Sequence, residues 1–174
     1  RYISVTGVQT CALPILLANL PPNVKAIRIN TNCSSVIEEL ADIIKKGIKV
    51  TVTVSFDGIG LVHNYIRWPI TWEKFEQNLL TYKAMPIDLD LWTTVNALNI
   101  GNFETILDFI NQHNFNHSYG LLNYPNELNV NYANDLTLPA KQRLEQSADP
   151  AIKKLSEQIA ISTNNNTELW EYVS

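Results

Sequence analysis

Strand-like and helix-like segments alternate along this chain of 174 residues, and the alternation constrains the fold more than any other feature. Four segments are rich in β-branched and apolar residues and are bounded by turn-forming residues, as strands are: 24–30, 48–55, 88–98 and 119–124. Segments with apolar residues at helical spacing lie between them. Strand, helix, strand at this spacing predicts consecutive βαβ units and an α/β fold with a parallel sheet.

Local signals mark the expected helices. A capping box at Ser35 and Glu38 predicts the start of the first helix, which Gly47 ends. Thr71 and Asn102 are expected to cap the second and third helices. From these patterns alone, the four strands belong either to part of a barrel or to half of a doubly wound sheet. In both folds ligands bind at the carboxyl ends of the strands.

The first fifteen residues need separate treatment. Residues 5–15 read VTGVQTCALPI, which matches without a gap the in-frame translation of a common sequencing-library adapter. We therefore expect residues 1–15 to be non-native. They should have no packing role, except in the place of a strand that the native upstream sequence would supply. This interpretation predicts that the chain is a fragment and that residues 16–125 are its α/β part. We expect residues 126–174 to form a helical C-terminal extension.

Composition excludes several classes of partner. The 13 Lys and Arg residues against 17 Asp and Glu give a net charge of −4, and no basic cluster occurs. This argues against nucleic acid or an anionic membrane as the main partner. The apolar stretch from Cys11 to Leu20 is interrupted by Pro14 and Asn19 and is too short to span a bilayer. Half of it falls within residues 1–15, so we discard a secretory signal and expect a cytoplasmic protein.

Short polar residues follow each predicted strand and are the candidates for ligand contact: Asn30, Thr31 and Asn32; Ser55 and Asp57; Asn96 and Asn99; Asn123 and Tyr124. Such residues also start turns and cap helices without any ligand. Arg67 either forks onto a carboxylate or phosphate or pairs with Glu73 or Glu76 at the surface.

Other chemistry-bearing residues give weaker signals. His113 and His117 have the spacing of metal ligands on a helix, but no third ligand is adjacent, so we expect no metal site. Cys33, the one cysteine outside residues 1–15, is expected to pack as an inert side chain rather than to react. No Walker, GxGxxG or GxSxG sequence occurs.

One set of motifs resembles a known family. Thr31-Asn32 follows a strand, and the next strand ends in Ser55-Phe-Asp-Gly58. The strings HNYIRWP (63–69) and WEKFEQN (72–78) come next, and the strand end NALN (96–99) and the stretch LNYPNEL (122–128) follow. In this order they resemble the central part of radical S-adenosylmethionine (SAM) proteins, most closely the twitch or SPASM subgroup. The resemblance covers about residues 24–144.

The resemblance implies a fold and an activity. The fold would be a slice of a partial (β/α)6 TIM-like barrel, with residues 16–125 as its C-terminal part. The full enzyme would reductively cleave SAM at a 4Fe–4S cluster and start radical modification of a substrate, such as a peptide or a small molecule. A flavodoxin or ferredoxin would supply the electron. Carried over residue by residue, Ser55 and Arg67 would approach the ribose or carboxylate of SAM, and Asn32 and Asp57 would line the pocket.

The chain departs from the family in two places. The CxxxCxxC loop that holds the cluster is absent, and so is the GGEP strand that contacts the methionine amino group. Both belong upstream of Val24, so we expect this chain alone to be inactive and its first native strand to lack a partner. Two alternatives stay open: another βα-barrel enzyme that binds a phosphorylated or amino-acid ligand, and a non-catalytic α/β binding module.

Overall fold

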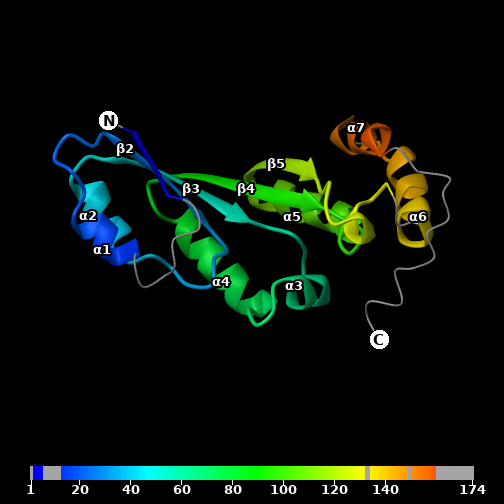
Figure 1. Cartoon of the computed structure of the whole chain (residues 1–174), viewed down its shortest axis with the longest axis horizontal. Coiled ribbons are helices and arrows are strands. Elements are labelled where there is room, and N and C mark those ends of the chain that lie inside the picture. The colour runs from blue at the N-terminus through cyan, green and yellow to red at the C-terminus, as the bar shows by residue number, and fades with distance from the viewer. Residues whose placement is uncertain (1, 6–12, 132–133, 149, 160–174) are drawn as a thin grey trace.

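A computed structural model describes residues 2–5, 13–131, 134–148 and 150–159 (Figure 1). Strands and helices alternate through most of this range. The elements are β1 (Tyr2–Val5), α1 (Leu13–Ala18), β2 (Ala26–Thr31), α2 (Leu40–Lys45), β3 (Lys49–Ser55), α3 (Leu61–Ile66), α4 (Trp72–Lys83), β4 (Asp88–Val95), η1 (Ile100–Asn102), α5 (Phe103–His113), β5 (Asn116–Leu121), η2 (Asn126–Leu128), α6 (Asn134–Glu145) and α7 (Pro150–Gln158).

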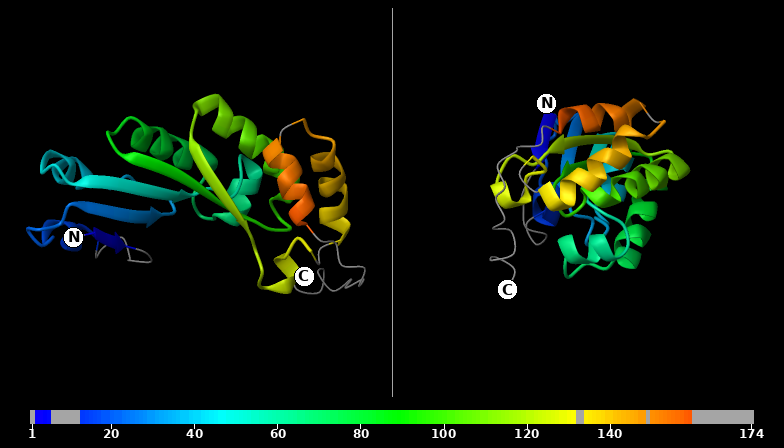
Figure 2. Two further views of the ribbon diagram at one scale, coloured as in Figure 1. Left: turned by 90° about the horizontal axis from the view of Figure 1, so that it is seen from above. Right: turned by 90° about the vertical axis from the view of Figure 1, so that its right-hand side faces the viewer.

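The strands form one parallel sheet whose spatial order follows the chain, β1-β2-β3-β4-β5. Each pair of neighbouring strands is parallel, including β3 and β4. The α/β fold and the adjacent parallel strands expected from the sequence are therefore confirmed. Helices α2, α4 and α5 lie on one side of the sheet (Figure 2). We refer to that side as the covered face and to the opposite side as the open face.

The segment Tyr2–Val5 corrects one expectation. It forms β1 and pairs with β2, in register from Tyr2 opposite Ala26 to Val5 opposite Ile29. The expectation that this edge of the sheet lacks a partner is therefore wrong for this structure. Residues 2–5 take the place of an additional strand, because a parallel edge offers unpaired N–H and C=O groups to any extended segment that reaches it.

The first long helix begins later than its capping signal predicts. The prediction that a capping box at Ser35 starts the helix is wrong, since α2 starts at Leu40. Long-range hydrogen bonds hold the preceding segment in a loop instead. The Tyr82 hydroxyl donates to the Ser35 carbonyl at 3.1 Å and accepts from the Ile37 N–H at 3.0 Å. Backbone groups that are satisfied by a side chain of α4 have less to gain from a helical turn.

The caps of the other two helices differ from each other. The Thr71 hydroxyl accepts from the Lys74 N–H at 3.4 Å at the start of α4, so the predicted cap is confirmed. Asn102 occupies the N-cap position of α5, but its side chain makes no capping bond. Its Oδ1 instead accepts from the Ile59 N–H at 3.0 Å. This bond connects the start of α5 to the loop that follows β3.

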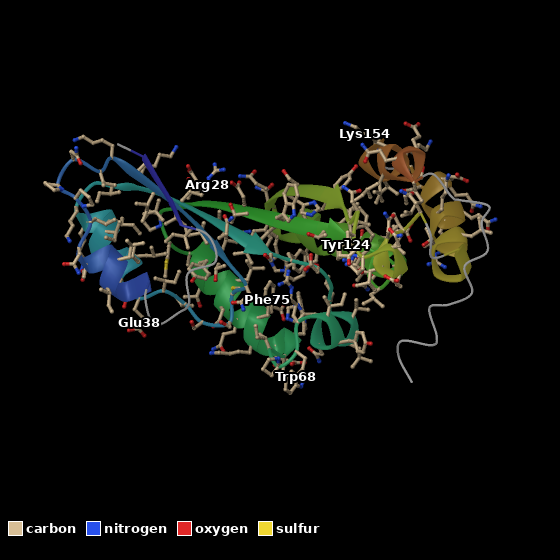
Figure 3. All side chains as sticks on the ribbon, viewed as in Figure 1. Arg28, Glu38, Trp68, Phe75, Tyr124 and Lys154 are labelled. Atoms are coloured by element: carbon tan, nitrogen blue, oxygen red, sulfur yellow. The ribbon has the colours of Figure 1, made fainter. Side chains whose placement is uncertain are left out.

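The covered face carries the core. Alternate residues of the central strands are buried against the helices, and an aromatic group closes the core at the end of β3. Phe56 is fully buried, with ring centroids 5.8 Å from Phe75 and 5.6 Å from Phe109. Figure 3 shows Phe75 on the α4 side of the sheet and Arg28 on the opposite side. The buried strand residues of the covered face are Ile27, Ile29, Val50, Val52, Val54, Leu91, Thr93 and Val95.

The extension after residue 126 is helical where the structure describes it. Helices α6 and α7 pack on each other, and α6 also packs on η1. The Lys141 ammonium donates to the Ile159 carbonyl at 2.7 Å and joins the two helices. Within the described residues, α6 therefore lies against the α/β part and α7 against α6, while residues 160–174 lie outside the described range. Among the described helices, none has the length and apolar character needed to cross a membrane.

Candidate functional site

The candidate site lies at the carboxyl end of β3, where the chain turns into α3. A sharp turn at Gly58 brings the first turn of α3 close to the end of β3. A Cβ at position 58 would lie 2.8 Å from Cγ1 of Val62 and 3.0 Å from the backbone nitrogen of His63. Only glycine fits without a shift of α3. The turn therefore holds α3 close against the end of the strand.

A buried ion pair forms the centre of the site. Asp57 and Arg67 expose 7% and 25% of their side chains, and Oδ2 of Asp57 accepts from Nη2 of Arg67. The other carboxylate oxygen, Oδ1, accepts from the Thr94 N–H at 2.9 Å. One carboxylate thus joins β3, β4 and the end of α3. The charge-assisted bonds offset the cost of burying the carboxylate.

This pair corrects the surface interpretation of Arg67. The sequence offered Glu73 or Glu76 as its partners, but the guanidinium binds Asp57 instead. Helix α3 ends at Ile66, and Arg67 is its C-cap residue. A buried carboxylate without a cation is costly, so the arginine lies over Asp57 rather than over α4. Of the four predicted site residues, Asp57 and Arg67 are in direct contact.

Ser55 and Asn32 have different surroundings. Ser55 is half-buried and lies opposite Trp92 in the sheet register, two residues before Asp57 on the same strand end. Asn32 is exposed, and its Oδ1 accepts from the Ser34 N–H at 3.2 Å to close a local turn. The structure therefore places Ser55 at the same strand end as the ion pair and gives Asn32 a role in the loop.

Sequence reasoning did not assign a role to His63, which packs beneath the pair. Its side chain is buried, with ring centroids 4.5 Å from Phe75 and 5.6 Å from Trp72. Neither ring nitrogen has a hydrogen-bond partner among the described residues. Burial, with help from the Arg67 charge, lowers the pKa of His63 to about 4. The imidazole is therefore neutral near pH 7. It carries no charge that would repel the Arg67 guanidinium, and Arg67 pairs with Asp57. The only sequence signal of His63 was its place in the HNYIRWP string.

The asparagines after β4 serve the backbone. The side-chain oxygen of Asn99 accepts from the Asn96 N–H at 2.8 Å. The side-chain amides of both residues donate to the Thr94 carbonyl, each at 3.0 Å. These bonds shape the turn that follows the strand. Asn96 and Asn99 were candidates for ligand contact, and the structure assigns their hydrogen bonds to the fold.

The two histidines weighed as metal ligands and Cys33 make contacts within the fold, and of the three only Cys33 is fully buried. His117 lies on β5, and its Nε2 is 2.9 Å from the Thr93 hydroxyl, whereas His113 packs on Phe109 at the end of α5. Cys33 is buried, with Sγ 3.9 Å from the Phe75 carbonyl. Burial raises the pKa of this thiol to about 12. A thiol with such a pKa is a poor nucleophile and a poor metal ligand at neutral pH.

No protein-family model matches the chain, and no curated protein or solved structure matches it either. The function is therefore inferred from the residues and their geometry.

Proposed function

We propose that this chain is part of a radical SAM enzyme and that the carboxyl end of β3 contributes to its SAM site. The observation that carries the proposal is the Asp57–Arg67 pair at the carboxyl end of the strand that Ser55 ends. All three residues lie in the segment whose motifs resemble the family. The pair joins β3, β4 and α3 at the carboxyl edge of the sheet. Parallel sheets bind their ligands at this edge.

The strand order supports the barrel part of the proposal. The spatial order of the strands follows the chain order, and α2, α4 and α5 lie on one face. A doubly wound sheet reverses its strand order and has helices on both faces, whereas a barrel does neither. We propose that the sheet is a slice of a partial (β/α)6 barrel and that its open face lines the barrel interior.

The residues at the edge suit the charged parts of SAM. Nη2 of Arg67 is occupied by Asp57, but its Nε–H is buried without a partner among the described residues. An acceptor oxygen of the ligand, such as the SAM carboxylate, would satisfy such a donor after a small shift of the side chain. The Ser55 hydroxyl would bond a ribose hydroxyl. Asp57 acts on the ligand through Arg67, as a positioning residue.

The 4Fe–4S cluster does not fit the residues of this chain. A cluster that binds SAM at its fourth iron needs three protein thiolates, and the sequence has two cysteines. One of them, Cys33, is buried with a raised pKa. We propose that the full enzyme supplies the cluster from sequence upstream of Val24. It would receive its electron from a flavodoxin or ferredoxin in the cytoplasm and act on a peptide or small-molecule substrate.

The test is SAM binding by the purified chain, measured by saturation-transfer difference NMR. We expect weak binding that Arg67→Lys reduces about tenfold, because lysine cannot keep the Asp57 bond and fork onto a carboxylate at once. Ser55→Ala should reduce it about threefold, the effect of one neutral hydrogen bond. Arg28→Lys is the matched control, since Arg28 is exposed on the open face near the opposite end of β2. Absence of SAM binding, or equal effects at positions 67 and 28, would refute the proposal.

A further inference from the structure

The open face of β4 carries an exposed tryptophan beside a carboxylate that has no described partner. Trp92 exposes 42% of its surface, while its chain neighbours Leu91 and Thr93 are buried. Asp90 and Trp92 are two residues apart on one strand, so both side chains project from the same face. The sheet register places Ser55 and Ser118 on either side of Trp92.

The indole ring has a fixed seat on the neighbouring strand. A Cβ at Gly120 would lie 3.0 Å from Cζ2 of Trp92 and 3.5 Å from Cη2. Glycine on β5 thus makes room for the ring, which leans from β4 over β5. A ring held against a glycine loses little further freedom when a ligand binds to its exposed surface.

The Asp90 carboxylate differs from the other acidic residue of this strand face. Asp88 forms an ion pair with Lys49 at 2.9 Å. Asp90 is half-buried between Thr53 and Asn116 in the register, and no hydrogen bond or ion pair engages it within the described ranges. Arg28 lies on the same face, two strands away and in the row of Asp88. The carboxylate next to Trp92 is therefore available to a cation from outside the chain.

We infer that Trp92 and Asp90 form a subsite for a planar cation, the guanidinium of an arginine side chain in a peptide ligand. The Cα atoms of Asp90 and Trp92 are about 7 Å apart along the strand, and the ring leans away from Asp90 toward Gly120, which lies in the row of Thr94. One arginine side chain is long enough to lie along the indole and still reach the carboxylate. A guanidinium stacks on an indole and forks onto a carboxylate, whereas a phosphate would be repelled by Asp90. This inference deepens the proposed function, and rests on it for the role of the bound peptide as substrate.

The test is titration of the purified chain at low ionic strength with the blocked tripeptide acetyl-Gly-Arg-Gly-amide, followed by calorimetry and NMR. The citrulline analogue, neutral but of the same shape, is the matched ligand. We expect citrulline to bind at least about tenfold more weakly, because it lacks the charge that both partners recognise. A lysine tripeptide should fall between the two, since an ammonium does not stack.

Four variants locate the subsite. Asp90→Asn and Trp92→Leu should each weaken arginine binding about fivefold or more. Asp88→Asn and Trp68→Leu are the controls, because Asp88 is already paired and Trp68 is exposed elsewhere, after α3. Should Trp92→Leu fail to fold, Trp92→Phe keeps a ring against Gly120 and should give an intermediate affinity. Equal binding of citrulline, or equal losses in Asp88→Asn and Asp90→Asn, would overturn the inference.

The titration contains no SAM. Its failure would therefore leave the SAM site of the proposed function untouched, and loss of SAM binding would leave the arginine subsite untouched. Arginine binding that Asp90→Asn and Trp92→Leu both reduce, and that the two controls leave unchanged, supports the subsite.

Discussion

The same strands form both faces of the sheet, but the two faces differ in burial and in polarity. On the covered face, Val52 and Leu91 are almost fully buried under the helices, and Phe56 joins their core. On the open face, Arg28 and Trp92 are exposed. Parallel sheets are usually buried on both faces, so a polar open face is unusual. The covered face therefore holds most of the buried apolar side chains, while the open face and the carboxyl edge carry exposed and charged ones.

The largest effect should separate two aromatic residues, one from each face. Phe56→Ala removes a fully buried ring that contacts both α4 and α5, and should cost about 3–5 kcal/mol of unfolding free energy. Trp92→Ala removes a larger but partly exposed ring and should cost less than about 2 kcal/mol. Urea denaturation of both variants makes the measurement. Equal losses of unfolding free energy in the two variants would show that the covered and open faces contribute equally to stability.

The second prediction compares two ion pairs, one at each end of the sheet. Asp57→Ala leaves Arg67 and the Thr94 N–H without their carboxylate, and should cost about 3 kcal/mol. Asp88→Ala breaks an exposed pair with Lys49 and should leave the urea midpoint unchanged. High salt should not rescue Asp57→Ala. A larger loss of unfolding free energy in Asp88→Ala than in Asp57→Ala would show that the ion pair at the amino ends of the strands contributes more to stability.

The third prediction concerns acid. The pKa of His63 is lowered from 6.5 to about 4 in the fold, so the fold favours the neutral ring. The stabilisation is complete above pH 6.5 and is lost as the pH falls from 6.5 to 4, where only the unfolded chain takes up the proton. Burial lowers the pKa of His117 to about 4 as well, so both histidines contribute to this loss.

His63→Phe should therefore flatten the dependence of stability on pH between 6.5 and 4 without abolishing it. Chemical denaturation at a series of pH values measures the slope. His113→Phe, at the end of α5, is the control. If the slope of stability against pH changes as much in His113→Phe as in His63→Phe, His63 is not the source of the acid sensitivity.

The smallest effect tests the seat of Trp92. Gly120→Ala places a methyl group 3.0 Å from the indole, so the ring must shift by a few tenths of an ångström. We expect a loss of about 1 kcal/mol or less and a change in the Trp92 indole N–H resonance. Gly101→Ala is the control, because a Cβ at this position would meet the flexible end of the Arg143 side chain at 3.7 Å. An unchanged indole resonance would show that the ring does not rest on Gly120.

Local sequence patterns predict the α/β fold class and the positions of most strands and helices correctly. The alternation in 48–55 and the cap at Thr71 are local signals, and β3 and α4 lie where these signals place them. Local patterns succeed here because a strand or helix shows its period within a few residues. Asp57 and Arg67 were also identified as candidates, from their place after a strand and within the HNYIRWP string.

The partners of these residues depend on the tertiary structure and could not be predicted from local patterns. The tertiary structure assigned Arg67 to Asp57, held Ser35 in a loop through Tyr82, and turned the Asn102 side chain toward Ile59. It also left Trp92 exposed on a face that its sequence pattern does not distinguish from a buried one. Each of these outcomes joins residues that are distant in the chain or depends on which layers cover the sheet. Hydrogen-bonding groups choose among partners by proximity in the folded state, and the local sequence carries no record of that proximity.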